Sequence, residues 1–205
     1  MADMTHHVSI ALVALAAAAL AAQTPKGWRM RVDESAAASD PAAARIDFTA
    51  TDRGFHAANP DGAVYWNDAD SASGDYTLKA SFTLMKPASS PNFYGLVFAA
   101  RDLEGPRRQY LYFMVAQDGT WLIKRRNADA SEDYIVPKTA SAAVQKPDAA
   151  GKSVNVLEVR AGAGAVQYLV NGTLVHSAAA EAAGVCGVRI TRLLDIQVDR
   201  FRLSK

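Results

Sequence analysis

Residues 153–176 read SVNVLEVRAGAGAVQYLVNGTLVH. Three short runs rich in Val and Leu are separated by turn signals, glycines at positions 162 and 164 and the pair Asn171-Gly172. An Asn-Gly pair favours the positive φ angles that a two-residue hairpin turn requires. The stretch therefore predicts three antiparallel strands joined by tight turns.

The same pattern extends in both directions along the chain. Short apolar or alternating runs recur, turn residues separate them, and no long amphipathic helical pattern stands between them. The candidate strands are Trp28–Val32, Arg45–Ala50, Ala63–Trp66, Tyr76–Met85, Phe93–Ala100, Gln109–Gln117, Thr120–Arg126, Tyr134–Val136, Ser153–Arg160, Ala165–Val170, Thr173–His176, Gly184–Ile190 and Ile196–Leu203. We expect an all-β protein, a two-sheet antiparallel β-sandwich of the jelly-roll type.

The first residues have a different character. Val8–Ala22 carries no charge, is too short and rich in alanine for a membrane span, and ends in small residues. This is typical of a secretory signal peptide. We expect residues 1–21 to be removed by cleavage near Ala21, leaving a single secreted or periplasmic domain, 22–205, that does not contact the membrane. An uncleaved anchor is the alternative.

Charge and cysteine content limit the classes of function. The 205 residues include 22 Lys and Arg against 21 Asp and Glu, and this balance argues against a nucleic-acid partner. Cys186 is the only cysteine, so the chain forms no internal disulfide. It lies in GVCGVRI, in step with Val188 and Ile190, and we expect a buried thiol in a strand. We also expect a monomer.

One hairpin brings aromatic and basic side chains together. Tyr110 and Tyr112 share a strand face, and a turn at Asp118-Gly119 brings Lys124 and Arg126 beside them. Aromatic rings stack on sugar rings, and polar side chains then orient the sugar. The alternative is that the two tyrosines are core rings. The candidate saccharide-binding residues are Trp66, Asn67, Tyr110, Tyr112, Lys124 and Arg126.

The segment NDADSASGD, residues 67–75, is rich in acids and turn formers. Asp68, Asp70 and Asp75 supply the oxygen ligands that Ca²⁺ prefers, although the spacing departs from a calcium-binding EF-hand loop. Asp, Ser and Gly also form turns by bonding their own backbone. We therefore expect this segment to form a corner of the sandwich. We expect the protein to need no cofactor, and a bound Ca²⁺ is the alternative.

Several motifs together resemble a known group of secreted bacterial domains. They are GAVYWNDADSASGDY (62–76), Tyr94-Gly95-Leu96, RQYLYF (108–113), DGTWLIKRRN (118–127) and the Val170-Asn171-Gly172 hairpin. The chain is similar to the concanavalin A-like lectin/glucanase superfamily, and within it to the 3-keto-disaccharide hydrolase and laminin G-like families. The resemblance implies a jelly-roll sandwich with a saccharide-facing concave sheet, and it transfers no catalytic motif.

Signals for catalysis are sparse. The paired carboxylates of lectin-fold glucanases, E-x-D-x-x-E, do not occur, and neither does G-x-S-x-G. In a keto-sugar the keto group makes the neighbouring C–H more acidic, so a base and an electrophile would suffice to cleave the glycosidic bond. The candidates for these roles are His56, Asp68 and Lys124. Three hypotheses follow: a saccharide-binding module first, a 3-keto-glycoside hydrolase-like enzyme second, and a laminin G-like protein-interaction module third.

Overall fold

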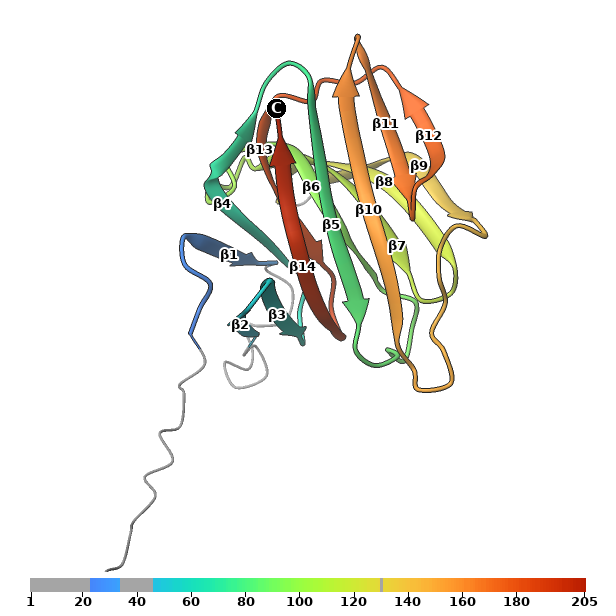
Figure 1. Ribbon diagram of the computed structural model, residues 1–205. Helices are drawn as coiled ribbons and strands as arrows, with labels where there is room; N and C mark the ends of the chain where they lie inside the picture. The colour runs from blue at the N-terminus through green and yellow to red at the C-terminus, as the bar shows by residue number, and fades with distance from the viewer. Residues whose placement is uncertain (1–22, 34–45, 130) are drawn as a thin grey trace, which may run out of the picture.

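The computed structural model describes residues 23–33, 46–129 and 131–205. They form a sandwich of two β-sheets packed face to face, which confirms the predicted fold class (Figure 1). The strands are β1 (Trp28–Val32), β2 (Asp47–Thr51), β3 (Gly54–Asn59), β4 (Ala63–Ala72), β5 (Tyr76–Leu84), β6 (Phe93–Arg101), β7 (Gln109–Ala116), β8 (Thr120–Ala128), β9 (Ser131–Ala140), β10 (Ser153–Gly162), β11 (Ala165–Val170), β12 (Thr173–Ala178), β13 (Gly184–Ile190) and β14 (Leu194–Ser204). The predicted signal peptide, residues 1–21, lies outside the described residues.

Each sheet has seven strands, and all of the pairings are antiparallel. Sheet A has the order β1-β4-β13-β6-β7-β8-β9, and sheet B has the order β12-β11-β10-β5-β14-β3-β2. Figure 1 shows sheet B in front, with β5, β10 and β14 at its centre. Within the described ranges, no helix is long and apolar enough to cross a membrane.

Tight turns connect the strands where the sequence predicts them. Asn171 and Gly172 have φ of 50° and 82° between β11 and β12, and Gly119 has φ of 87° between β7 and β8. Positive φ at both central residues gives the turn a twist that matches its flanking strands. The predicted meander of β10, β11 and β12 is confirmed by the antiparallel pairing of β11 with both neighbours.

The core lies between the sheets and is built by alternation along each strand. In β5, Leu78, Ala80 and Phe82 are fully or almost fully buried, while Lys79 between them faces outward. Cys186 is completely buried in the same core, as expected. Burial raises the pKa of this thiol to about 12, so the thiol stays protonated at neutral pH.

Three strand predictions were wrong in extent. Gly54–Asn59, which was not among the candidate strands, is strand β3, where Phe55 and Ala57 point into the core. Residues 67–72, expected as a corner, continue β4, because the far end of β4 pairs with β13. Strand β9 is longer than expected because it pairs along most of β8. Strand pairing overrides the turn preference of Asn, Asp and Ser.

Candidate functional site

The outer face of sheet A carries a second buried apolar cluster, separate from the core between the sheets. Its members are Val64, Trp66, Val97, Ala100, Leu103, Tyr110, Tyr112, Met114 and Leu122. The outer face of a sandwich sheet is usually wetted and polar. A buried cluster here shows that side chains from neighbouring strands and loops cover the middle of the sheet.

The pairing of strands places most of the predicted binding residues in adjacent rows on this face. Tyr112 lies opposite Lys124, and Tyr110 opposite Arg126. Lys124 in turn lies opposite Tyr134 of β9. The predicted neighbourhood of tyrosines and basic side chains is therefore confirmed.

The two tyrosines do not form an open platform. Tyr110 is 2% exposed and Tyr112 is 1% exposed. The Arg126 guanidinium lies 5.9 Å from the ring centroid of Tyr110, and that of Arg189 lies 5.4 Å from the ring centroid of Tyr112. Burial raises the pKa of Tyr112. These rings cannot stack on a sugar as the sequence suggested, because guanidinium groups already cover them.

The covering groups form an ion-paired cluster, which we call the arginine network. It consists of Arg31, Asp33, Arg108, Lys124, Arg126, Asp129, Glu132 and Arg189. At its centre, Asp33 accepts from Arg189 at 2.6 Å and from Arg108 at 3.0 Å. Asp129 connects Arg31 to the rest of the network, because its carboxylate oxygens lie 3.0 Å from Arg31 and 2.8 Å from Arg108.

Glu132 of β9 is the second anchor of the arginine network. It accepts from Lys124 at 3.0 Å, forms an ion pair with Arg126, and lies 3.8 Å from Arg189. Burial alone would raise the pKa of Glu132, but hydrogen bonding to Lys124 and the nearby guanidinium charges lower it. In the same way Arg189 overrides the burial of Asp33 and lowers its pKa. Both carboxylates are therefore charged at neutral pH.

Sequence reasoning missed Asp33, Arg108, Asp129, Glu132 and Arg189 as site residues. One signal was present: Arg189 is the only charged residue in the otherwise apolar strand GVCGVRI. Its side chain is 6% exposed. A charge in a buried strand requires a partner, but the partner Asp33 lies 156 positions away, and the sequence does not show that contact.

Trp66 lines a small pocket at one side of this face, with a cavity volume of about 180 Å³. Its indole N–H donates to Asp68 at 2.9 Å, and Arg29 donates to the same carboxylate at 2.7 Å. The Arg29 hydrogen bond lowers the pKa of Asp68. Asn67 accepts the backbone N–H of Ala69 at 3.1 Å and is not among the residues that line this pocket.

The acids proposed for calcium do not form one cluster. Asp68 pairs with Arg29, whereas the charge of Asp70 interacts with Lys205 and Cys186. The carboxylate of Asp75 lies near Gly162. Across the part of the chain that the structure describes, no three His, Cys, Asp or Glu side chains are grouped to hold a metal ion. The reason is that residues 67–72 are an extended strand and not a loop.

His56 lies on the other side of the molecule. Its neighbours Phe55 and Ala57 point into the core, so His56 points outward from sheet B. There it bonds Asp195 at 2.7 Å, and Asp195 also pairs with Lys86 at 3.2 Å. The structure does not bring the candidates His56 and Lys124 together, because their side chains lie on opposite faces of the sandwich.

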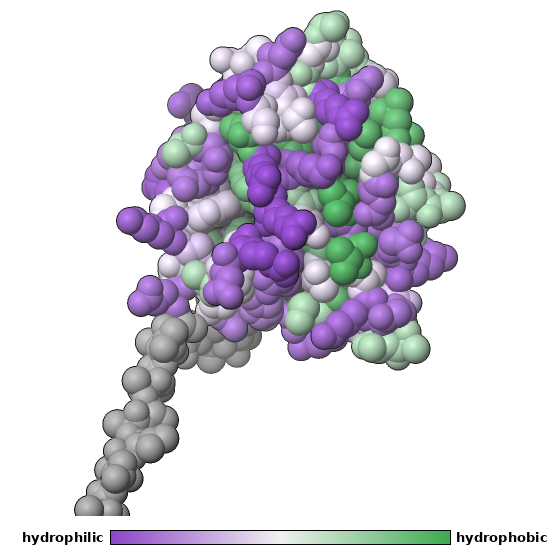
Figure 2. All heavy atoms as spheres, in the orientation of Figure 1, coloured by the Kyte–Doolittle hydropathy of each residue, from purple (hydrophilic) through white to green (hydrophobic). Residues whose placement is uncertain are grey.

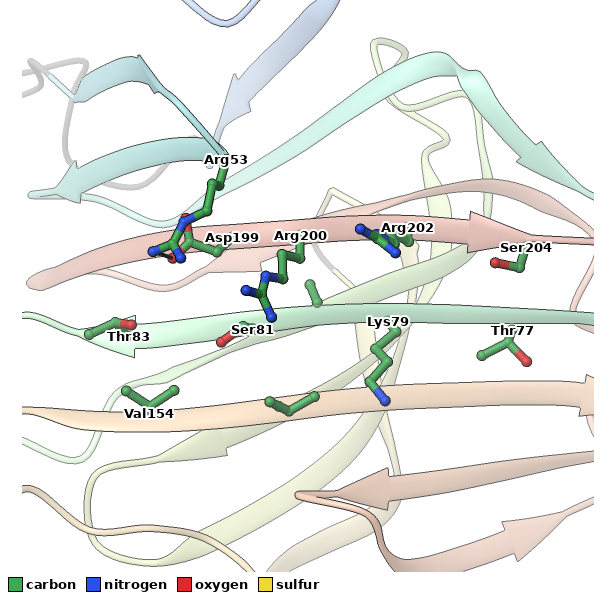
Figure 3. A pocket seen from close by; sticks show the side chains of 12 residues that line it. Arg53, Thr77, Lys79, Ser81, Thr83, Val154, Asp199, Arg200, Arg202 and Ser204 are labelled. Carbon is green, nitrogen blue, oxygen red and sulfur yellow. Dashed lines mark hydrogen bonds and ion pairs between the residues drawn. The ribbon is translucent and has the colours of Figure 1, made fainter.

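An open depression lies on the outer face of sheet B, and we call it the sheet B groove. Its cavity volume is about 660 Å³, and strands β5, β10 and β14 form its floor (Figure 3). Hydroxyl and basic side chains line it, and none of its lining residues is aromatic. None of the residues that line it was a candidate in the sequence analysis.

Comparison with solved structures agrees with this architecture. The chain is similar to the carbohydrate-binding module CBM66 from Bacillus subtilis, with a TM-score of 0.64 at 11% identity over 87% of this chain and 96% of that one. It is also similar to a protein of unknown function with a galectin-like fold from Bacillus subtilis, with a TM-score of 0.59 at 15% identity over 87% and 89% of the two chains. The fold is a galectin-like β-sandwich.

A third similar structure is the Emp47p carbohydrate recognition domain, with a TM-score of 0.52 at 9% identity over 88% of this chain and 89% of that one. At these identities the likeness concerns the fold alone. No protein-family model matches the chain, and a search of curated proteins finds no match. The resemblance to 3-keto-disaccharide hydrolases and laminin G-like modules therefore stays a prediction.

Proposed function

We propose that this protein is a carbohydrate-binding module that holds a saccharide on the outer face of sheet A, over the arginine network. The observation that carries the proposal is the gathering of guanidinium groups and charged carboxylates on one face of one sheet. Sugar hydroxyls both donate and accept hydrogen bonds. Arginine N–H groups and carboxylate oxygens are therefore complementary to them.

The arginine network is held in place before any ligand binds. Asp33 and Glu132 each accept from two basic side chains, so their rotamers are fixed by several bonds at once. Binding to such a face costs little side-chain entropy, which favours affinity. Both acids keep some solvent access, with side chains 18% and 26% exposed. A ligand on the surface can therefore reach their remaining lone pairs.

The network also retains unused donors. Arg108 Nη1, Arg126 Nε and Arg189 Nε are buried and make no hydrogen bond with any described residue. Buried donors without a partner are costly, and a water, ion or ligand commonly accounts for them. These three nitrogens are covered in the structure, so a saccharide on the surface would contact the partly exposed carboxylates of Asp33 and Glu132 instead.

The edge of the network offers an aromatic surface. Tyr134 of β9 is 59% exposed. The Lys124 ammonium lies 4.2 Å from the centroid of its ring. The ring is therefore held in place and still exposes most of its area. Tyr134 takes the stacking role that the sequence analysis had given to Tyr110 and Tyr112.

The fold supports the proposal. The first similar structure is described as a carbohydrate-binding module, and another has a galectin-like fold. These descriptions apply to those two proteins, and they make a saccharide the first class of ligand to test on this one.

The test is calorimetric titration with neutral mono- and oligosaccharides of glucose, galactose and fructose. Tyr134→Ala and Glu132→Gln are the test variants, and Asp133→Asn is the matched control on the same strand, because Asp133 contacts Asn127 and not the network. We expect the two test variants to weaken binding about tenfold, which corresponds to about 1.4 kcal/mol, and the control to bind normally. If no sugar binds, or if all three variants bind equally, the proposal is wrong.

A further inference from the structure

The sheet B groove has a composition different from that of the arginine network. Figure 2 shows hydrophilic side chains gathered down the middle of this face. Its lining includes four hydroxyl side chains and four basic ones, from Arg53, Thr77, Lys79, Ser81, Thr83, Arg200, Arg202 and Ser204. Asp199 is the only carboxylate that lines it. The groove is therefore basic, although the chain as a whole is close to neutral.

Two of the basic groups are already paired. Lys79 donates to Glu158 at 2.8 Å, and Arg53 lies 3.4 Å from Asp199. Glu158 is 7% exposed and also pairs with Arg160, so it holds Lys79 firmly. These pairs contribute little net charge to the groove.

The other two basic groups, Arg200 and Arg202, have no carboxylate within 4.0 Å among the described residues. Arg202 lies directly opposite Lys79 in the pairing of β14 with β5. Glu158 offsets the charge of Lys79, so the uncompensated charge at this pair of residues is that of Arg202. The groove thus has a fixed surplus of positive charge at one place.

The backbone of β14 is irregular where it positions Arg200 and Arg202. The register of β14 against β5 shifts between Asp199 and Arg202, and Arg200 has φ of 53°. Such a conformation is unfavourable for a residue other than glycine. Arg200 is held in it by a hydrogen bond of 2.9 Å from its N–H to the carbonyl of Arg53. Figure 3 shows the Arg200 side chain extending over the floor of the groove. Bulges that redirect a side chain occur preferentially beside functional sites.

We propose that the sheet B groove is a second binding site, which takes a segment of an acidic oligosaccharide bearing carboxylate groups. Arg200 and Arg202 bind the carboxylates, since a guanidinium matches a carboxylate in two parallel hydrogen bonds. The Ser and Thr hydroxyls of the floor bind the sugar hydroxyls. The cavity volume of about 660 Å³ lies within the range of ligand sites and admits more than one sugar ring.

The composition argues against a nucleic acid as the occupant. Single-stranded nucleic acids are bound by stacking their bases on aromatic rings, and the groove offers none. Two free guanidinium groups are also few for a phosphate backbone, which carries a charge at every nucleotide. The proposal is independent of the saccharide proposed for sheet A, because the two sites lie on opposite faces.

The probe is tetragalacturonate, with its fully methyl-esterified form as the neutral comparison. Arg200→Gly combined with Arg202→Gln removes both free charges. Glycine suits the φ of 53° at position 200, so this variant keeps the bulge. Arg192→Gln is the matched control, because Arg192 is exposed in the turn between β13 and β14 and does not line the groove. Binding is measured by calorimetry, with the thermal midpoint of each variant as a folding check.

We expect tetragalacturonate to bind the full chain, more weakly at about 300 mM than at about 50 mM NaCl, because salt screens exposed charges. The double variant should bind about tenfold more weakly, while Arg192→Gln and Glu132→Gln should bind normally. Equal binding of the methyl ester would overturn the proposal, as would an unchanged Kd in the double variant. Loss of tetragalacturonate binding in Glu132→Gln would instead place this ligand on sheet A. Recruitment to phosphatidylserine vesicles, lost only in the double variant, would reassign the groove to a membrane surface.

Discussion

Arg189 and Asp33 are joined by a hydrogen bond of 2.6 Å that ties β13 to the residue directly after β1. Arg189 is almost fully buried, and the same carboxylate also holds Arg108 at 3.0 Å. The pair therefore determines how the outer face of sheet A is closed over Tyr110 and Tyr112. The stability of this face and its chemistry depend on the same contact.

Removing one partner of this pair should be costly. Arg189→Met would leave Asp33 without its main partner, in a site where burial disfavours a lone charge. We expect the free energy of unfolding to fall by about 3 kcal/mol, measured by urea titration. Arg192→Met, an exposed change of the same type, should shift it by less than about 0.5 kcal/mol. Similar losses in the two variants would show that the Arg189–Asp33 pair is not a special contributor to stability.

Stability should decrease in acid through Asp33 and Glu132. Their pKa values are lowered in the folded state, so the unfolded chain binds protons more readily. The stabilisation is therefore present above the ordinary pKa values of 3.8 and 4.5, and it is lost as pH falls below them. Urea titrations between about pH 6 and about pH 3 measure this loss. Glu132→Gln should reduce the slope, and an unchanged slope would contradict the assignment.

The Cys186 thiol should be unreactive in the folded protein. It is fully buried, and burial raises its pKa to about 12. The thiolate is the reactive form of cysteine. In the folded protein a reagent cannot reach the sulfur, and the thiol does not ionise at neutral pH. We expect an alkylating reagent to label the native protein very slowly and to label it fully in urea, as followed by mass spectrometry. Rapid labelling of native protein would mean that β13 opens readily.

Gly95 should tolerate no side chain. A Cβ at this position would lie 2.1 Å from the carbonyl oxygen of Phe113 and 2.8 Å from Leu157. Gly95→Ala should therefore lower the free energy of unfolding by at least about 2 kcal/mol. Gly164→Asn is the control, since no atom lies within 4 Å of that site and asparagine tolerates its φ of 75°. A stable Gly95→Ala variant would imply that β6 and β7 can move apart.

The amino terminus should be processed on export. Val8–Ala22 has the length and composition of a signal peptide. Expression with this segment in a bacterial host should yield a periplasmic or secreted protein that begins close to residue 22. Intact-mass measurement of the purified protein determines the first residue. An unprocessed, membrane-bound product would support the alternative, an uncleaved anchor.

Strand positions could be predicted wherever alternation was strong. Leu78, Ala80 and Phe82 alternate with polar residues, and β5 lies where they predict it. Strand β3 was missed because Gly54–Asn59 contains two alanines and a histidine, which give a weak pattern. Its strand character comes from pairing with β14 on one side and β2 on the other.

The site could be predicted only in part. Tyr112 lies six positions before Asp118 and Lys124 five positions after Gly119, so pairing across this turn placed them together. The burial of Tyr112 could not be predicted, because Arg189 of β13 covers its ring from a distant part of the chain. The sheet B groove could not be predicted from the sequence either, because β5, β10 and β14 become neighbours only on folding.

The amino-acid sequence by itself determined the class of the fold, its hairpin turns and which side of most strands is buried. These features depend on residues close together in the chain, through alternation and the φ angles of Asn and Gly. Tertiary structure alone decided which outward faces stay open. That choice depends on the order of the strands and on ion pairs such as Arg189–Asp33, whose partners lie far apart in the chain and meet only when the sheets form.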